Sequence, residues 1–109
     1  MNSFEPDLIN PDLSDEELLQ RLNGETAQLP WKELESHFAR GVVVRVDSEL
    51  DLIDVAVSFT RDDRDSVETL MSEGKIARAT DDDAMRWSEQ QSTFWAIVVA
   101  PWVLIQELK

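Results

Sequence analysis

The single histidine of the chain, His37, is the residue whose type and spacing come closest to catalytic chemistry. It follows Glu33 by one helical turn, so a carboxylate could support it as a general base. A histidine on the flank of a helix with no catalytic role fits the pattern better, and no serine lies in a Gly-x-Ser-x-Gly elbow or beside a second histidine. We therefore assign no catalytic residue and favour a protein that is not an enzyme.

Acidic residues alternate at Asp47, Glu49 and Asp51, the spacing with which a calcium-binding loop begins. The sixth position of such a loop would be Leu52 instead of glycine, and the twelfth would be Ser58 instead of glutamate. The chain has no cysteine, which excludes thiolate metal sites and disulfides, and its three glycines are isolated, which excludes phosphate-binding glycine loops. We expect no metal site and no cofactor.

The charge of the chain excludes other classes of partner. Lys and Arg number 10 and Asp and Glu number 23, which gives a formal net charge of -13 at pH 7. Such a field repels phosphate backbones and anionic lipid headgroups, so we expect no binding to nucleic acid and none to a membrane surface. Solubility accounts for the acidity, and a macromolecular partner that uses this surface should be a basic protein.

Neither the start of the chain nor its apolar tail resembles a targeting or membrane segment. The first residues have no basic region followed by an apolar region, as a secretory signal would. The uncharged stretch from Ser92 to Gln106 is shorter than the roughly 20 apolar residues that a membrane helix needs. We expect a cytoplasmic protein.

The length of 109 residues fits one globular domain, which we place at residues 14–109 after an acidic arm at residues 1–13. Ser14 and Glu17 form a capping box, which predicts a helix from about Asp15 into the twenties. Pro30 suits the first position of a second helix, and Gly41 suits its end. These signals predict a helical hairpin, with the spacing of Trp31, Leu34 and Phe38 marking the buried face of its second helix.

The middle of the chain predicts a strand over residues 42–46 and a short strand within residues 75–79. Residues 52–60 fit both a half-buried strand and a helix capped by Ser48 or Asp51, and we favour the helix. Two further helices are predicted. The first begins with the capping pair Asp65/Glu68, buries a face formed by Val67, Leu70 and Met71, and ends at Gly74. The second begins with the capping pair Thr80/Asp83, buries a face formed by Ala84 and Trp87, and ends near Gln91.

The tail from Phe94 to Leu108 carries no charge before Glu107 and is apolar on both faces of a strand, so it must be buried in this chain or against another subunit. Pro101 cannot donate a hydrogen bond to a sheet, so we expect two strand segments with a kink at Pro101. The predicted fold is α+β, with four or five helices packed on a small, mainly antiparallel sheet.

Four tryptophans in so small a chain suggest that one or two serve as interface anchors or line an apolar pocket. We expect a homodimer that shares the tail strand or its Pro101 bend. The alternative is a small-molecule or enzymatic pocket beside Trp31 or Trp102, with Glu33, His37 or Glu107 as its polar group. The candidate binding and interface residues are Trp31, Trp95, Pro101, Trp102, Leu104, Gln106 and Glu107.

The order of residues in two segments resembles a known family. The segments are Leu22-Asn23, Glu25-Thr26-Ala27, Trp31, Glu33-Leu34, Phe38-Ala39 and Gly41, and then Val98-Val99-Ala100-Pro101-Trp102-Val103-Leu104 with Gln106-Glu107. They are similar to a family of small bacterial proteins known as domain-of-unknown-function family 2288, and the likeness covers residues 18–108. The resemblance implies a bacterial cytoplasmic protein and carries over no activity, cofactor or catalytic residue.

Overall fold

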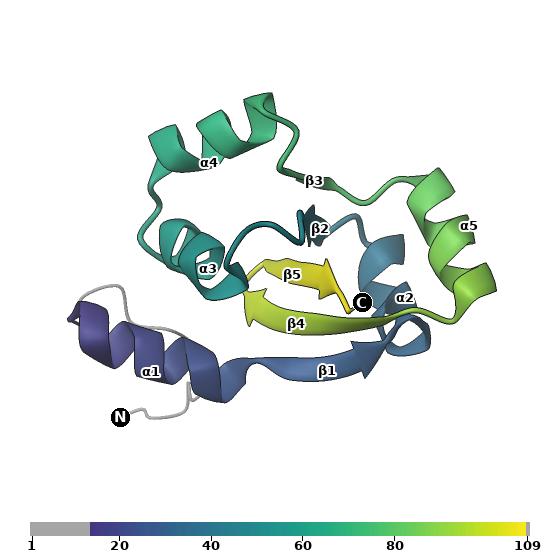
Figure 1. Cartoon of the computed structure of the whole chain (residues 1–109), viewed down its shortest axis with the longest axis horizontal. Coiled ribbons are helices and arrows are strands. Elements are labelled where there is room, and N and C mark those ends of the chain that lie inside the picture. Colours follow the sequence, from purple (N-terminus) through teal and green to yellow (C-terminus); the bar gives the residue numbers. More distant parts are fainter. Residues whose placement is uncertain (1–13, 109) are drawn as a thin grey trace.

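The computed structural model describes residues 14–108, so the predicted arm at residues 1–13 lies outside the described residues. Five helices and five strands alternate along this part of the chain (Figure 1). Their bounds are α1 Asp15–Glu25, β1 Ala27–Pro30, α2 Trp31–Ala39, β2 Val43–Val46, α3 Leu52–Thr60, α4 Arg64–Ser72, β3 Ile76–Arg78, α5 Asp81–Gln90, β4 Thr93–Val99 and β5 Trp102–Glu107.

The strands form one open sheet in the order β1-β4-β5-β2-β3. Neighbouring strands are antiparallel except β2 and β5, which run parallel. The two apolar tail strands therefore lie inside the sheet, and the shorter β1 and β3 form its edges. This architecture confirms the predicted α+β class with a mainly antiparallel sheet.

The tail forms a tight hairpin instead of one bent strand. β4 and β5 pair from Phe94↔Glu107 to Val99↔Trp102, and only Ala100 and Pro101 lie between them. The Ala100–Pro101 peptide bond is cis, the arrangement found in type VI turns. Pro101 thus marks the boundary between two strand segments, as expected, but the chain reverses its direction there instead of kinking.

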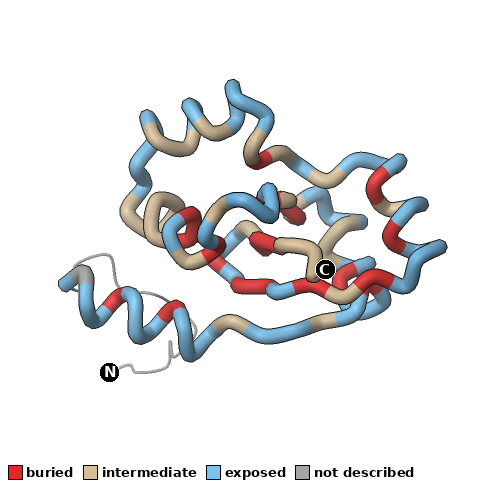
Figure 2. Tube along the Cα trace, viewed as in Figure 1, coloured by how far each residue is buried: buried red, intermediate tan, exposed pale blue. Residues whose placement is uncertain are grey.

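The sheet is covered on both faces, because alternate residues of its central strands point to two separate cores. The first core lies under α1 and α3 and the second under α2 and α5. Figure 2 marks the buried segments of α1, α3, α5 and the central strands in red. The buried members of the first core are Leu18, Leu22, Val44, Val46, Leu52, Val55, Ala56, Ile76, Ile97, Val99 and Leu104. Those of the second core are Trp31, Leu34, Val43, Trp87, Phe94, Ala96, Val103 and Ile105.

Local signals set most of the helix boundaries. The capping box of Ser14 and Glu17 begins α1, and Asp51 caps α3, which confirms the helix over residues 52–60. Gly41 and Gly74 follow α2 and α4 with positive φ angles of 76° and 75°, a conformation that glycine adopts without steric cost.

Three predicted details of the helices were wrong. Asp63, not Asp65, caps α4, because its carboxylate accepts the hydrogen bond of the Ser66 N–H. Met71 is exposed, since α4 lies at the periphery of the first core and contributes only partly buried side chains to it. Pro30 is the N-cap of α2, one position before the predicted one.

The predicted helical hairpin was also wrong, because the edge strand β1 separates α1 from α2. β1 reads Ala-Gln-Leu-Pro and has no β-branched residue, so its sequence carries little strand signal. It becomes a strand only by pairing with β4, from Ala27↔Ala96 to Pro30↔Thr93. Pro30 is tolerated there because it stands at the end of an edge strand.

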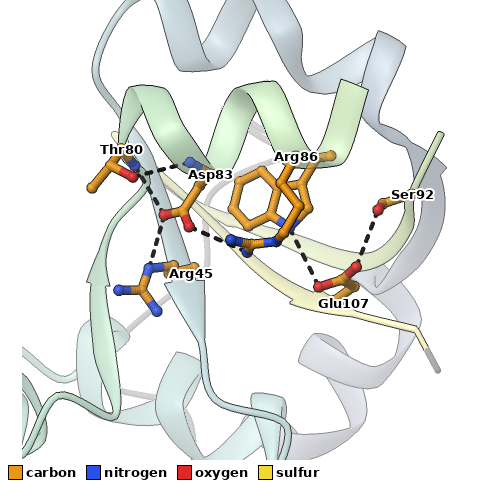
Figure 3. A network of polar contacts seen from close by, with 7 residues as sticks. Arg45, Thr80, Asp83, Arg86, Ser92 and Glu107 are labelled. Atoms are coloured by element: carbon orange, nitrogen blue, oxygen red, sulfur yellow. Dashed lines mark hydrogen bonds and ion pairs between the residues drawn. The ribbon is translucent and has the colours of Figure 1, made fainter. Parts of the chain in front are cut away.

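A buried carboxylate fastens α5 to the sheet. Asp83 and Thr80 form the predicted capping box, in which the Thr80 N–H donates to Asp83 Oδ2 at 3.0 Å and the Asp83 N–H donates to Thr80 Oγ1 at 3.1 Å. Arg45 Nε of β2 lies 3.0 Å from Asp83 Oδ2, and Arg86 donates to Asp83 Oδ1 at 3.2 Å (Figure 3). Arg45 is the one charged residue of β2, and this ion pair balances its charge.

The pKa of Asp83 reflects these contacts. Burial raises the pKa of the carboxyl, but the hydrogen bonds from Thr80 and the charges of Arg45 and Arg86 outweigh burial and lower the pKa below its ordinary value of 3.8. Because the pKa of Asp83 is lower in the folded chain than in the unfolded chain, ionised Asp83 stabilises the fold at pH values above the ordinary pKa. That stability is lost as the pH falls through the folded-state pKa.

We predict that Asp83→Asn lowers the free energy of unfolding by about 1.5–3 kcal/mol at pH 7, the range for hydrogen bonds to charged groups. Urea denaturation at several pH values measures this loss. The difference from the wild-type protein should shrink as the pH falls below about 4, because Asp83 binds a proton there in the unfolded chain before it does so in the folded one.

Asp82→Asn is the matched control, since Asp82 is exposed in the same first turn of α5. It should change the free energy of unfolding by no more than about 0.5 kcal/mol. Equal losses in the two variants would contradict the assigned role of the ion pairs.

Candidate functional site

Two of the predicted site residues lie in the cores. Leu104 is fully buried in the first core, so it contributes to no outer surface. Trp31 is only 4% exposed, with its ring centroid 5.2 Å from that of Trp87 and 5.6 Å from that of Phe38. Phe94 completes this aromatic cluster, 5.0 Å from Trp87. Such ring pairs add to the energy of burial.

Several large apolar side chains of the described chain are exposed, and Trp95, at 38% exposure, is the aromatic one among them. Its cross-strand neighbours are Gln28 of β1 and Gln106 of β5, and directly paired residues share a face of the sheet. We call these three side chains the Trp95 face. Val98, 52% exposed, points to the opposite face of the same strand.

Both tail strands have a hydrogen-bonded neighbour on each side. β1 pairs with β4 only from Thr93 to Ala96, however, so residues 97–99 of β4 have no strand partner on that side among the described strands. Within the described chain, a dimer through a shared tail strand could pair only at this short stretch of β4. Only side chains of the tail, chiefly those of Trp95 and Val98, face outward.

Pro101 and Trp102 line a hollow of about 400 Å³ between the hairpin turn and the start of α4. The Arg78 guanidinium lies 5.0 Å from the centre of the Trp102 ring, as in a cation–π contact, and the other side of the ring packs against the first core. Asp62 and Asp63 also line this hollow. Trp102 is thus half-buried, and its contacts with Arg78 and the first core are internal to the fold.

A second hollow, of about 500 Å³, lies beside Trp31 between α2 and α5, with Lys32 and Glu35 at its opening. The predicted polar groups do not line either tryptophan hollow. Glu33 is exposed elsewhere on α2, and His37 Nδ1 lies 2.8 Å from an Arg40 guanidinium nitrogen. The structure therefore does not assemble the predicted combinations of Trp31 or Trp102 with Glu33, His37 or Glu107.

Gln106 and Glu107 both serve internal contacts. The Gln106 amide donates to the carbonyls of Asp47 at 2.9 Å and Leu50 at 2.7 Å, which holds the turn after β2 against β5. Glu107 accepts hydrogen bonds from Trp87 Nε1 at 3.3 Å and from Ser92 Oγ at 3.0 Å (Figure 3).

Glu107 also lines a polar cleft of about 240 Å³, together with Arg45 and Arg86. Arg45 and Arg86 were not predicted from the sequence as site residues, and Asp83, which joins them, was predicted only as a helix cap. The signal that could have found them is Arg45, a charged residue within a run of valines, because a charge in a buried strand requires a partner.

Acidic side chains also lie beside an apolar groove between α3 and α4. This groove, of about 460 Å³, has Leu50, Val55 and Leu70 at its base. Asp51, Asp54 and Asp65 line it as well, and all three are exposed. We call it the acidic groove.

Within residues 14–108, no group of three or more histidine, cysteine, aspartate or glutamate side chains is placed to hold a metal ion. None of the helices described here combines the length and the apolar character needed to cross a bilayer.

Comparison with known proteins identifies a family. The chain is similar to the NMR solution structure of PA1075 from Pseudomonas aeruginosa, with 42% sequence identity and a TM-score of 0.76 over 90% of each chain. No curated protein matches it. A family model described as a protein of unknown function, DUF2288, matches residues 17–107. The chain therefore belongs to the DUF2288 family, which confirms the resemblance found in its sequence.

Proposed function

We propose that this protein is a non-enzymatic, cytoplasmic interaction domain that forms a homodimer through the Trp95 face. The exposure of Trp95 is the observation that supports this function most directly. Tryptophan is enriched among the residues that dominate binding energy at protein interfaces. Gln28 beside it is exposed and offers an amide group that can hydrogen bond around it.

The position of Trp95 suits a symmetric dimer. In a two-fold dimer the same patch of both copies meets, so one aromatic side chain per chain supplies two anchors. The Trp95 face is formed by β4 and β5, which have neighbouring strands on both sides, and by the edge strand β1. Such a surface loses little conformational entropy when it binds.

A second candidate function is binding of a basic protein in the acidic groove. The groove combines an apolar base with three exposed aspartates, and the whole chain has a net charge of -13. A basic amphipathic segment complements both features, with its apolar side on the base and its cations at the aspartates.

The third candidate is binding of an apolar small molecule in the hollow beside Trp31. The supporting observation is its volume of about 500 Å³. This volume lies within the range of about 300–1,000 Å³ that is usual for ligand pockets.

We predict that the protein sediments as a dimer at micromolar concentration and that Trp95→Ala weakens the dimer by about 30-fold or more, the loss expected for a dominant interface residue. Val98→Ala is the matched control, because Val98 is exposed on the opposite face of the same strand. A wild-type protein that is monomeric, or equal weakening in both variants, would refute the proposed interface.

The response to salt separates the first two functions. Two copies of a chain with a charge of -13 repel each other, so raising NaCl from about 0.02 M to about 0.3 M should tighten the homodimer. The same change should weaken binding of a lysine-rich amphipathic peptide to the acidic groove. Sedimentation and peptide titration at both salt concentrations measure whether each dissociation constant rises or falls. A homodimer that dissociates in salt would contradict an apolar interface.

The third function predicts a shift in thermal stability. A ligand of the Trp31 hollow at 100 times its dissociation constant adds about 2.7 kcal/mol to stability. Ser88→Tyr places a larger side chain at an exposed position that lines this hollow and should abolish the shift. Ligands that still raise the thermal stability of the Ser88→Tyr variant bind elsewhere. A broad metabolite library that does not change the stability of the wild-type protein would exclude the third function.

A further inference from the structure

The polar cleft lies where two parallel strands end side by side. β2 and β5 run parallel, with Arg45 paired to Ile105, so their carboxyl ends meet at the same edge of the sheet. Helix α5 contributes Arg86 and Trp87 to the cleft. In open sheets that contain parallel strands, such an edge is a common position for ligand binding.

Two arginines give one side of the cleft a positive charge. The side chains of Arg45 and Arg86 are 44% and 48% exposed, whereas that of Asp83, which both contact, is 9% exposed. Arg45 reaches Asp83 through Nε and Arg86 through one terminal nitrogen. A guanidinium has five N–H donors, so each arginine keeps donors for a ligand while Asp83 fixes its position (Figure 3).

The Glu107 carboxylate gives the cleft a negative charge beyond the Trp87 indole. Trp87 Nε1 and Ser92 Oγ each donate to a different oxygen of Glu107, which fixes its orientation. A carboxylate can accept about four hydrogen bonds, so two of these remain for a ligand. The Arg86 guanidinium lies 5.6 Å from the centre of the indole ring. The indole thus contacts both a cation and a carboxylate, and Asp47 is a second carboxylate that lines the cleft.

We propose that this cleft binds a small aminocarboxylate zwitterion, with its carboxylate at Arg45 and Arg86 and its ammonium group at Glu107. Phe94 and Ile105 also line the cleft, but both are completely buried, so the charged groups carry the recognition. A zwitterion also suits the net charge of -13, because a neutral molecule is not repelled by the field that repels a simple anion.

NMR of the uniformly ¹⁵N-labelled protein tests the proposal, because the Trp87 indole N–H reports directly on the cleft. Glycine, γ-aminobutyrate and ε-aminocaproate, at up to millimolar concentration, offer three distances between the ammonium and carboxylate groups. At least one of them should shift the Trp87 indole signal saturably. Acetate and propylamine, which each carry one of the two charges, should bind more weakly. Equal binding of acetate would overturn the zwitterion, and no saturable shift with any probe would overturn the site.

Variants assign the two ends of the ligand. Arg86→Gln and Glu107→Gln should each weaken the best probe by about 10- to 100-fold, which corresponds to losing one charged hydrogen bond. Arg86→Lys should restore part of the affinity, because the ammonium group keeps the positive charge. Arg64→Gln is the control, since Arg64 is an exposed arginine paired with Asp62 at the start of α4. Affinity unchanged in Arg86→Gln would refute the assignment.

The cleft and the proposed dimer are tested independently. Arg45, Ile105 and Glu107 alternate with Val44, Leu104 and Gln106, so the cleft opens on the face of the sheet opposite to Trp95. Trp95→Ala should therefore leave the zwitterion affinity unchanged, and Glu107→Gln should leave the dimer intact.

Discussion

The β4–β5 hairpin must be covered on both faces, and the rest of the structure follows from this constraint. Its side chains alternate between two cores, with Ile97 and Leu104 in one and Phe94 and Ile105 in the other. Complete burial of such a side chain contributes about 1.5–3 kcal/mol. A single layer of helices would leave one of these rows in water. The chain therefore places α1 and α3 on one side of the sheet and α2 and α5 on the other (Figure 1).

Coverage of both faces requires that each helix be fastened to the sheet, and α5 uses polar contacts as well as apolar ones. It brings Trp87 into the aromatic cluster, and it also brings Asp83 to the charge that β2 carries at Arg45. The ion pair costs desolvation, but an arginine without a partner at this position would cost more. Because Asp83 also caps the helix, one carboxylate determines both where α5 begins and where it lies on the sheet.

The candidate binding regions are what this coverage leaves open. The helices leave Trp95 partly exposed on one face. On the other face, the cleft of Arg45, Arg86 and Glu107 remains beside α5, at the carboxyl ends of the parallel strands. The acidic groove lies away from the sheet, between α3 and α4. Membership in DUF2288 fixes the family and assigns no activity. The proposals for this protein therefore rest on these surfaces and on their charges.

The sequence by itself determined the elements whose signals are local. Caps such as Ser14 and Thr80 and the run of valines before Asp47 lie within a few residues of the structure they specify, and so the helices, the central strands and the α+β class were predictable. Only the tertiary structure decided what depends on distant partners. β1 is a strand because β4 lies beside it, and Met71 is exposed because none of the residues 14–108 packs over that side of α4. Arg45 and Glu107, 62 positions apart in the chain, share a cleft because β2 and β5 are parallel neighbours, and no local pattern encodes that pairing.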